Sequence, residues 1–209
     1  WASRRGNPLP LGRGGCQAVG RPASGEPQNL LAQATHWADP VKRLQVIHRM
    51  YALRFGDVIP SRRSVEQLRG IEGARVREAY KILARQHGIE RKGRNYDSAD
   101  WATADPINRA LSAANACMHG LCEAVVVACG YSPVLGFIHT GGRLSFIYDI
   151  ADLYKLQYCA PAAFRLVGRG VPDVEVRVRH ELREQFRSTK LVSRIAADLD
   201  ALFPAEAKP

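Results

Sequence analysis

One helix with a carboxylate set into its apolar stripe constrains this chain more than any other stretch. Residues 64–87 begin with a capping pair, Ser64 and Gln67, and then place apolar side chains at helical spacing. Those apolar positions are Val65, Leu68, Val76, Ala79 and Leu83. The spacing requires a further residue between Leu68 and Val76, and the chain supplies Glu72. Because a desolvated carboxylate is costly without a positive partner, the sequence predicts a cation beside Glu72.

Two kinds of cation fit this position, and the helix alone does not choose between them. Arg69 and Arg75 lie three residues before and after Glu72, so both can reach its face and form an Arg-Glu-Arg cluster. The alternative is a metal ion, or a catalytic role for the carboxylate. The rest of the chain has to decide.

The composition indicates a folded, strongly basic protein. Of 209 residues, 46% are hydrophobic and 24% charged, which is ordinary for a globular protein. The net charge of +10 favours nucleic acid or another anionic surface as a partner. The cysteines are odd in number and lack CxxC spacing, which argues against a zinc cluster or a disulfide framework and fits the cytoplasm. No apolar run approaches the roughly 20 residues of a membrane span, and we expect no membrane partner.

The order of segments predicts a mainly α fold. Residues 1–27 are rich in glycine and proline and are expected to be loop or disorder. Short and long helical patterns follow, and two of them begin with a cap followed by proline, at Asp39-Pro40 and Asp105-Pro106. The predicted helices cover residues 30–37, 41–55, 64–87 and 105–130, a stretch that contains Asp149 and Asp152, and two or three helices in 161–203.

A histidine and two acids form the strongest chemical pattern. His139 lies in a glycine-rich turn, and Asp149 and Asp152 follow three residues apart on a predicted helix. We expect both acids near the start of that helix, where its dipole favours carboxylates. Carboxylate oxygens suit hard divalent cations, and an imidazole adds a preference for a manganese-like ion without excluding magnesium.

Two basic segments are candidate nucleic-acid contacts. Residues 91–101 interleave arginine and lysine with Tyr96 and Trp101, although a solvated connector would look similar. Residues 173–190 form a predicted helix with a ladder of basic side chains at Arg179, Arg183, Arg187 and Lys190. A solvated face of mixed charge is the alternative there, because Glu181 and Glu184 adjoin the ladder. The chain has no Walker loop, Rossmann fingerprint, nucleophile elbow or HExxH motif.

These motifs carry a resemblance to a known family. Residues 62–73, residues 95–97, the stretch Gly136-Phe-Ile-His139-Thr-Gly and residues 144–152 resemble the CRISPR-associated integrase that inserts new spacers into CRISPR arrays. The resemblance is to the branch found with Cascade interference systems. It covers residues 28–203, and several motifs keep their order and mutual spacing.

The resemblance implies a metal site and a set of DNA contacts. Glu72, His139 and Asp152 would be both the catalytic residues and the ligands of Mg²⁺ or Mn²⁺, with Asp149 as a supporting acid. The implied nucleic-acid contacts are Arg69, Arg143, Arg179, Tyr96 and Trp101. The basic residue after the His-Thr-Gly turn, Arg143, is displaced by one position from the family's pattern.

The resemblance also implies a function and an assembly. The implied activity is that of a metal-dependent DNA endonuclease and integrase that acts in antiviral adaptation by hydrolysis and strand transfer. A helical catalytic domain at 28–203 would follow a remnant of a β-domain at 1–27 and precede a tail at 204–209. The implied partners are double-stranded DNA (prespacer and CRISPR repeat), a second copy of the chain, and a small ferredoxin-like partner dimer. The alternative is a truncated, catalytically silent DNA-binding subunit.

Overall fold

The computed structural model describes residues 28–56, 63–90 and 105–204. These residues form eight helices, and none of them lies in a strand, which confirms the mainly α prediction for this part of the chain. The helices are α1 (Gln28–Ala38), α2 (Pro40–Phe55), α3 (Val65–Gln86), α4 (Pro106–Ala128), α5 (Ser145–Asp152), α6 (Cys159–Gly168), α7 (Val174–Ser188) and α8 (Leu191–Leu202).

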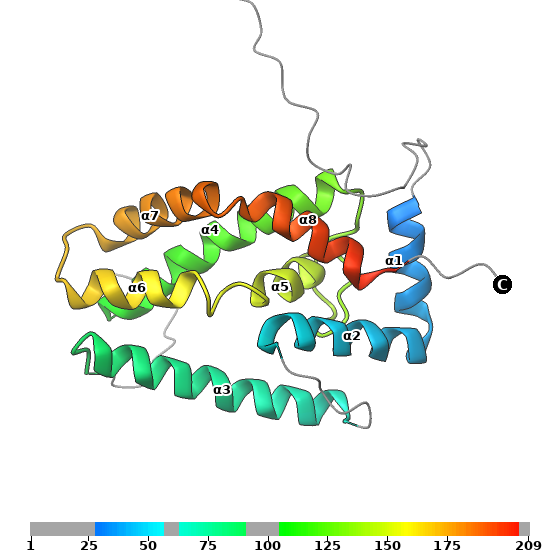
Figure 1. Ribbon diagram of the computed structural model, residues 1–209, viewed down its shortest axis with the longest axis horizontal. Coiled ribbons are helices and arrows are strands. Elements are labelled where there is room, and N and C mark those ends of the chain that lie inside the picture. The colour runs from blue at the N-terminus through cyan, green and yellow to red at the C-terminus, as the bar shows by residue number, and fades with distance from the viewer. Residues whose placement is uncertain (1–27, 57–62, 91–104, 205–209) are drawn as a thin grey trace, which may run out of the picture.

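Helix α4 is the centre of the molecule. It packs against α5, α6, α7 and α8 (Figure 1). Small side chains such as Ala110 and Ala114 are fully buried and let these neighbours approach closely. The sequence predicted no membrane span, but α4 is long and apolar enough to cross a membrane by length and composition. However, 44% of its most apolar 18-residue window is buried inside the protein.

Local signals set the ends of α2 and α3. Asp39 caps α2 by accepting hydrogen bonds from two backbone amides of its first turn, and Gly56 ends it in the left-handed conformation (φ 66°). Ser64 and Gln67 form the predicted capping box at the start of α3, with bonds of 3.3 and 3.1 Å. Helix α3 then runs along one edge of the molecule, beside α2 and α6 (Figure 1).

Helix α5 differs from the prediction in one respect. Asp149 and Asp152 lie in its second half, and Asp152 is its last residue. The dipole at a helix start therefore does not hold these acids, and that part of the prediction was wrong. Their stabilising partners are backbone amides and basic side chains, which belong to the site.

Candidate active site

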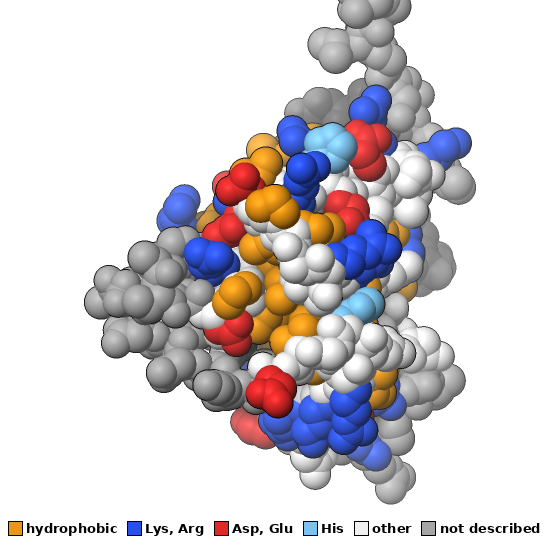
Figure 2. Space-filling view, turned by 90° about the vertical axis from the view of Figure 1, so that its left-hand side faces the viewer, with side chains coloured by type: hydrophobic (Ala, Val, Ile, Leu, Met, Phe, Trp, Pro, Cys, Tyr) orange, Lys and Arg blue, Asp and Glu red, His pale blue; other side chains and the backbone are white. Residues whose placement is uncertain are grey.

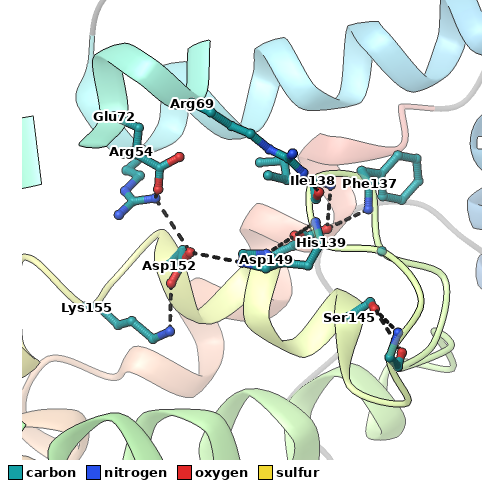
Figure 3. A network of polar contacts seen from close by, with 12 residues as sticks. Arg54, Arg69, Glu72, Phe137, Ile138, His139, Ser145, Asp149, Asp152 and Lys155 are labelled. Carbon is teal, nitrogen blue, oxygen red and sulfur yellow. Dashed lines mark hydrogen bonds and ion pairs between the residues drawn. The ribbon is translucent and has the colours of Figure 1, made fainter. Parts of the chain in front are cut away.

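The loop that carries His139 is held by a buried carboxylate. Asp149 is 1% exposed, and it accepts hydrogen bonds from the backbone amides of Phe137 (2.6 Å), Ile138 (3.1 Å) and His139 (2.8 Å) (Figure 3). A carboxylate that accepts several backbone N–H groups is stabilised as the anion, so its burial is compensated. We refer to residues 132–139 as the histidine loop.

The carbonyl groups of the histidine loop are bound from the other side. The donors are side chains of α1, α2 and α3. Gln33 donates to Ser132 (3.0 Å) and Leu135 (3.1 Å), Trp37 to Gly136 (3.0 Å), Arg43 to Phe137 (3.1 Å), and Arg69 to Ile138. The loop therefore has hydrogen-bond partners for backbone amides on one side and for backbone carbonyls on the other. These bonds fix the backbone that positions His139.

Gly136 allows the histidine loop to close on itself. A Cβ atom at this position would lie 2.3 Å from the carbonyl oxygen of His139 and 2.6 Å from the Cβ of Ser145. Those atoms are backbone or directly attached to it, so no flexible side chain could yield. The close approach therefore requires glycine.

Asp149 also orients the imidazole of His139. The Nδ1 atom lies 2.8 Å from Asp149 Oδ1, and because an ionised carboxylate only accepts, Nδ1 is the protonated nitrogen. This hydrogen bond raises the pKa of His139. The Nε2 atom, which keeps its lone pair when the ring is neutral, lies 4.0 Å from Asp152 Oδ2. The neutral ring of His139 therefore turns toward Asp152 the nitrogen whose lone pair is free to accept a proton or bind a cation.

Glu72 reaches the same site from α3 through partners on α2. Tyr51 donates to Glu72 Oε2 at 2.8 Å, and Arg54 donates to Glu72 Oε1. Burial, followed by this hydrogen bond, raises the pKa of Tyr51. Arg54 also lies 3.9 Å from Asp152 Oδ2, and Lys155 lies 2.7 Å from Asp152 Oδ1 (Figure 3). The guanidinium of Arg54 thus stands between the two carboxylates.

The donor set fits a hard divalent cation in chemistry. Two carboxylates and one imidazole nitrogen are suitable ligands for Mg²⁺ or Mn²⁺. In residues 28–56, 63–90 and 105–204, however, no three His, Cys, Asp or Glu side chains are already gathered closely enough to hold an ion. Glu72 and Asp152 are joined through Arg54, so the cation that the sequence predicted beside Glu72 is a guanidinium in this structure.

The predicted DNA contacts lie in different places. Arg69 binds the Ile138 carbonyl, and Arg143 is exposed between the histidine loop and α5. Arg179 is exposed on α7. Tyr96 and Trp101 lie outside the described residues.

The basic ladder is exposed but is not one continuous helical row. Arg179, Arg183 and Arg187 lie on α7, whereas Lys190 follows it in the left-handed conformation (φ 51°). Arg187 pairs with Glu184 at 3.3 Å, so part of the mixed-charge alternative is present.

A second basic row was not noticed in the sequence. Figure 2 shows Lys and Arg side chains gathered at the lower edge of one end of the molecule, the height at which α3 lies in Figure 1. Helix α3 carries the exposed side chains of Arg77, Lys81 and Arg85 at intervals of four.

Four further residues of the site were missed by sequence reasoning. Tyr51 and Arg54 are three apart on α2, and Lys155 is three residues after Asp152, so helical spacing was the available signal. His119 packs its ring against Tyr148 with centroids 4.9 Å apart. Its Nε2 is buried without a hydrogen-bond partner in the part of the chain that the structure describes.

Comparison with known proteins agrees with a helical domain of this kind. A family model described as CRISPR associated protein Cas1 matches residues 30–186. The CRISPR-associated endonuclease Cas1 of Geobacter sulfurreducens is 48% identical over 90% of this chain and 61% of its own length. A Thermus thermophilus relative, CRISPR-associated endonuclease Cas1 2, is 51% identical over 82% of this chain and 53% of its own. A crystal structure of a TtCas1–DNA complex superposes with a TM-score of 0.80 at 48% identity, covering 86% of this chain and 67% of that one.

The chain belongs to the Cas1 family. It spans between about half and two thirds of the length of the curated relatives quoted above. What those relatives do as whole proteins is therefore a proposal for this chain.

Proposed function

We propose that this chain is a divalent-metal-dependent DNA endonuclease and integrase of CRISPR spacer acquisition. Glu72, His139 and Asp152 would hold the Mg²⁺ or Mn²⁺ ion. The observation that supports this most is that Arg54 joins Glu72 of α3 to Asp152 of α5, while His139 Nε2 of the histidine loop lies 4.0 Å from Asp152 Oδ2. Relatives named CRISPR-associated endonuclease Cas1 support nuclease chemistry at this site.

The chain's own residues would prepare the site for phosphodiester chemistry. A bound divalent ion would supply Lewis-acid activation of the phosphate and of the attacking hydroxyl. Asp149 holds a proton on His139 Nδ1 and thereby keeps Nε2 available as a ligand. Tyr51 orients Glu72, and Lys155 holds Asp152 from the opposite side. With water as the attacking group the result is cleavage; with a DNA 3′-hydroxyl it is strand transfer, which conserves the number of phosphodiester bonds.

The DNA contacts are proposed from charge and exposure. Arg143 and Arg179 are exposed, and the net charge of +10 attracts a polyanion. Arg69 would act indirectly, because its guanidinium is bound to the Ile138 carbonyl beside His139. We propose prespacer and CRISPR repeat DNA as the substrates, and pairing with a second copy and with a ferredoxin-like partner dimer as the assembly. The proposed location is the cytoplasm, and the proposed catalytic domain is residues 28–203.

A strand-transfer assay on a CRISPR repeat with Mn²⁺, with and without the partner dimer, tests this function. The wild-type chain should give product, and Asp152→Ala should give none while still binding DNA. Loss of DNA binding in Asp152→Ala would mean that the variant is not a clean catalytic mutant, and Glu72→Ala then takes its place.

The alternative is a catalytically silent DNA-binding subunit. The presence of all three proposed ligand residues favours an enzyme over this alternative. DNA binding that weakens with salt, without any metal-dependent product from the wild-type chain, would support the silent subunit.

A further inference from the structure

Arg54 occupies an unusual position for an arginine. Its side chain is only 7% exposed at the end of α2, and its guanidinium lies 5.3 Å from the ring centroid of Phe55. Its Nε is buried without a hydrogen-bond partner among the described residues. A buried guanidinium with an unused donor is expensive, so its position requires an electrostatic reason.

The reason lies in the two carboxylates on either side of it. Arg54 Nη1 binds Glu72 Oε1 and lies 3.9 Å from Asp152 Oδ2. Both carboxylates are largely desolvated, at 16% and 19% side-chain exposure. Without Arg54, Glu72 would keep the neutral donor Tyr51, while Asp152 would keep the ion pair with Lys155. Arg54 therefore supplies the charge that a divalent ion would otherwise supply.

Three of the four carboxylate oxygens are already bound. Glu72 Oε1 is bound by Arg54 and Oε2 by Tyr51. Asp152 Oδ1 is bound by Lys155, which leaves Oδ2, the atom that Arg54 and His139 Nε2 both approach. An ion that binds both carboxylates would therefore meet Asp152 at Oδ2, which lies 3.9 Å from Arg54.

We propose that Arg54 is an internal counter-ion that competes with the divalent cation for Glu72 and Asp152. It holds the two carboxylates in place when no ion is bound, and its guanidinium must withdraw from them for an ion to bind, because the two positive charges repel at this range. Arg54 is thus a positioning residue that lowers metal affinity and stabilises the metal-free fold. The inference rests on the proposed function, since it takes Glu72 and Asp152 to be metal ligands.

The test is Mn²⁺ titration by calorimetry, together with thermal unfolding with and without Mn²⁺, on the 209-residue chain. Arg54→Met removes the charge but keeps much of the side-chain volume, and Arg54→Lys keeps the charge. Arg187→Gln is the matched control, because it removes one positive charge from an ion pair on the surface. Arg54→Met should bind Mn²⁺ about tenfold more tightly, a change of the size seen when groups that adjoin metal ligands are altered. Arg54→Lys should fall between it and wild type, and Arg187→Gln should match wild type.

Stability should move in the opposite direction. Without Mn²⁺, Arg54→Met should melt below wild type, because Glu72 loses the cation that binds it and Asp152 keeps only the ion pair with Lys155. Saturating Mn²⁺ should remove that difference. A variant that folds only when Mn²⁺ is added would support the proposal equally.

Failure of this inference is distinct from failure of the proposed metal site. If wild type binds Mn²⁺ and Asp152→Ala does not, but Arg54→Met binds it no more tightly than wild type, the Arg54 inference is wrong and the metal site stands. If Arg54→Met stays unfolded in saturating Mn²⁺ and Arg54→Lys binds like wild type, the inference is also wrong. If wild type shows neither binding heat nor a Mn²⁺-dependent melting shift, both proposals fail.

Discussion

At the scale of single residues, the site depends on hydrogen bonds that orient charged groups. Tyr51 is 2% exposed and donates to Glu72, and Tyr154 is 1% exposed and donates to Asp198 at 2.6 Å. The two tyrosines are alike in burial and in having a carboxylate as hydrogen-bond partner, but only the partner of Tyr51 is a proposed metal ligand. They can therefore separate a role in stability from a role in metal binding.

Tyr51→Phe and Tyr154→Phe should each lower the free energy of unfolding by about 2 kcal/mol, the range for a hydrogen bond to a charged group. Only Tyr51→Phe should also weaken Mn²⁺ binding, by about tenfold, because Glu72 loses the neutral donor that orients it. Urea unfolding and calorimetry measure the two effects. If both variants bind Mn²⁺ with equal affinity, Tyr51 has no role in metal binding.

His119 should give the chain a specific sensitivity to acid. Burial lowers its pKa to about 4, whereas an exposed histidine in the unfolded chain titrates near 6.5. Between these values the unfolded chain binds more protons, so stability is full above about pH 6.5 and falls as the pH drops toward 4. In His119→Phe, which keeps a ring against Tyr148, the loss of unfolding free energy between pH 7.5 and 4.5 should be smaller than in wild type. Parallel pH profiles by urea unfolding would contradict this assignment.

At the scale of elements, the histidine loop is the part most sensitive to substitution. Gly136→Ala should lower the free energy of unfolding by about 3 kcal/mol, because its methyl group meets the His139 carbonyl and the Ser145 Cβ. Gly142→Ala is the matched control in the same connection, since its methyl group would meet only Ser145 Oγ, at 3.5 Å. Chemical denaturation compares them, and equal stability of the two variants would mean that the loop is not packed as described.

The helices were predictable because their signals are local. Asp39-Pro40, Ser64 with Gln67, and Asp105-Pro106 each begin a helix within a residue of the predicted start. Such caps act over three residues, so a single sequence contains them. The acids of α5 were misplaced because no side-chain cap marks the start of this helix, which begins at Ser145, four residues before Asp149.

The site was predictable only in part, for the opposite reason. Its acids and histidine stood out as residue types, but their partners come from distant parts of the chain. Trp37 and Gly136 are 99 residues apart, and no spacing rule connects them. Arg54 was likewise hidden, because Glu72 had nearer arginines in sequence while the fold brought one from α2.

At the scale of the whole molecule, close packing around α4 sets the stability. Ala114 is fully buried, and its carbonyl accepts a hydrogen bond from Cys159 of α6 at 3.5 Å. Ala114→Leu should lower the free energy of unfolding by about 1–3 kcal/mol, because the added atoms would push α4 and α6 apart. Ala116→Leu, on an exposed position of the same helix, should change it little. Urea unfolding of both variants measures this, and a tolerated leucine at position 114 would show that the packing is loose.

The way the histidine loop is held also limits how genes of this family can recombine. The loop lies after α4, but its carbonyls are bound by Gln33, Trp37, Arg43 and Arg69, all from the first three helices. A chimera joined between α3 and α4 would take the donor side chains from one parent protein and the loop carbonyls from the other. Because the acceptors are backbone carbonyls, a chimera joined there should keep the loop only if its first segment still supplies these donor side chains.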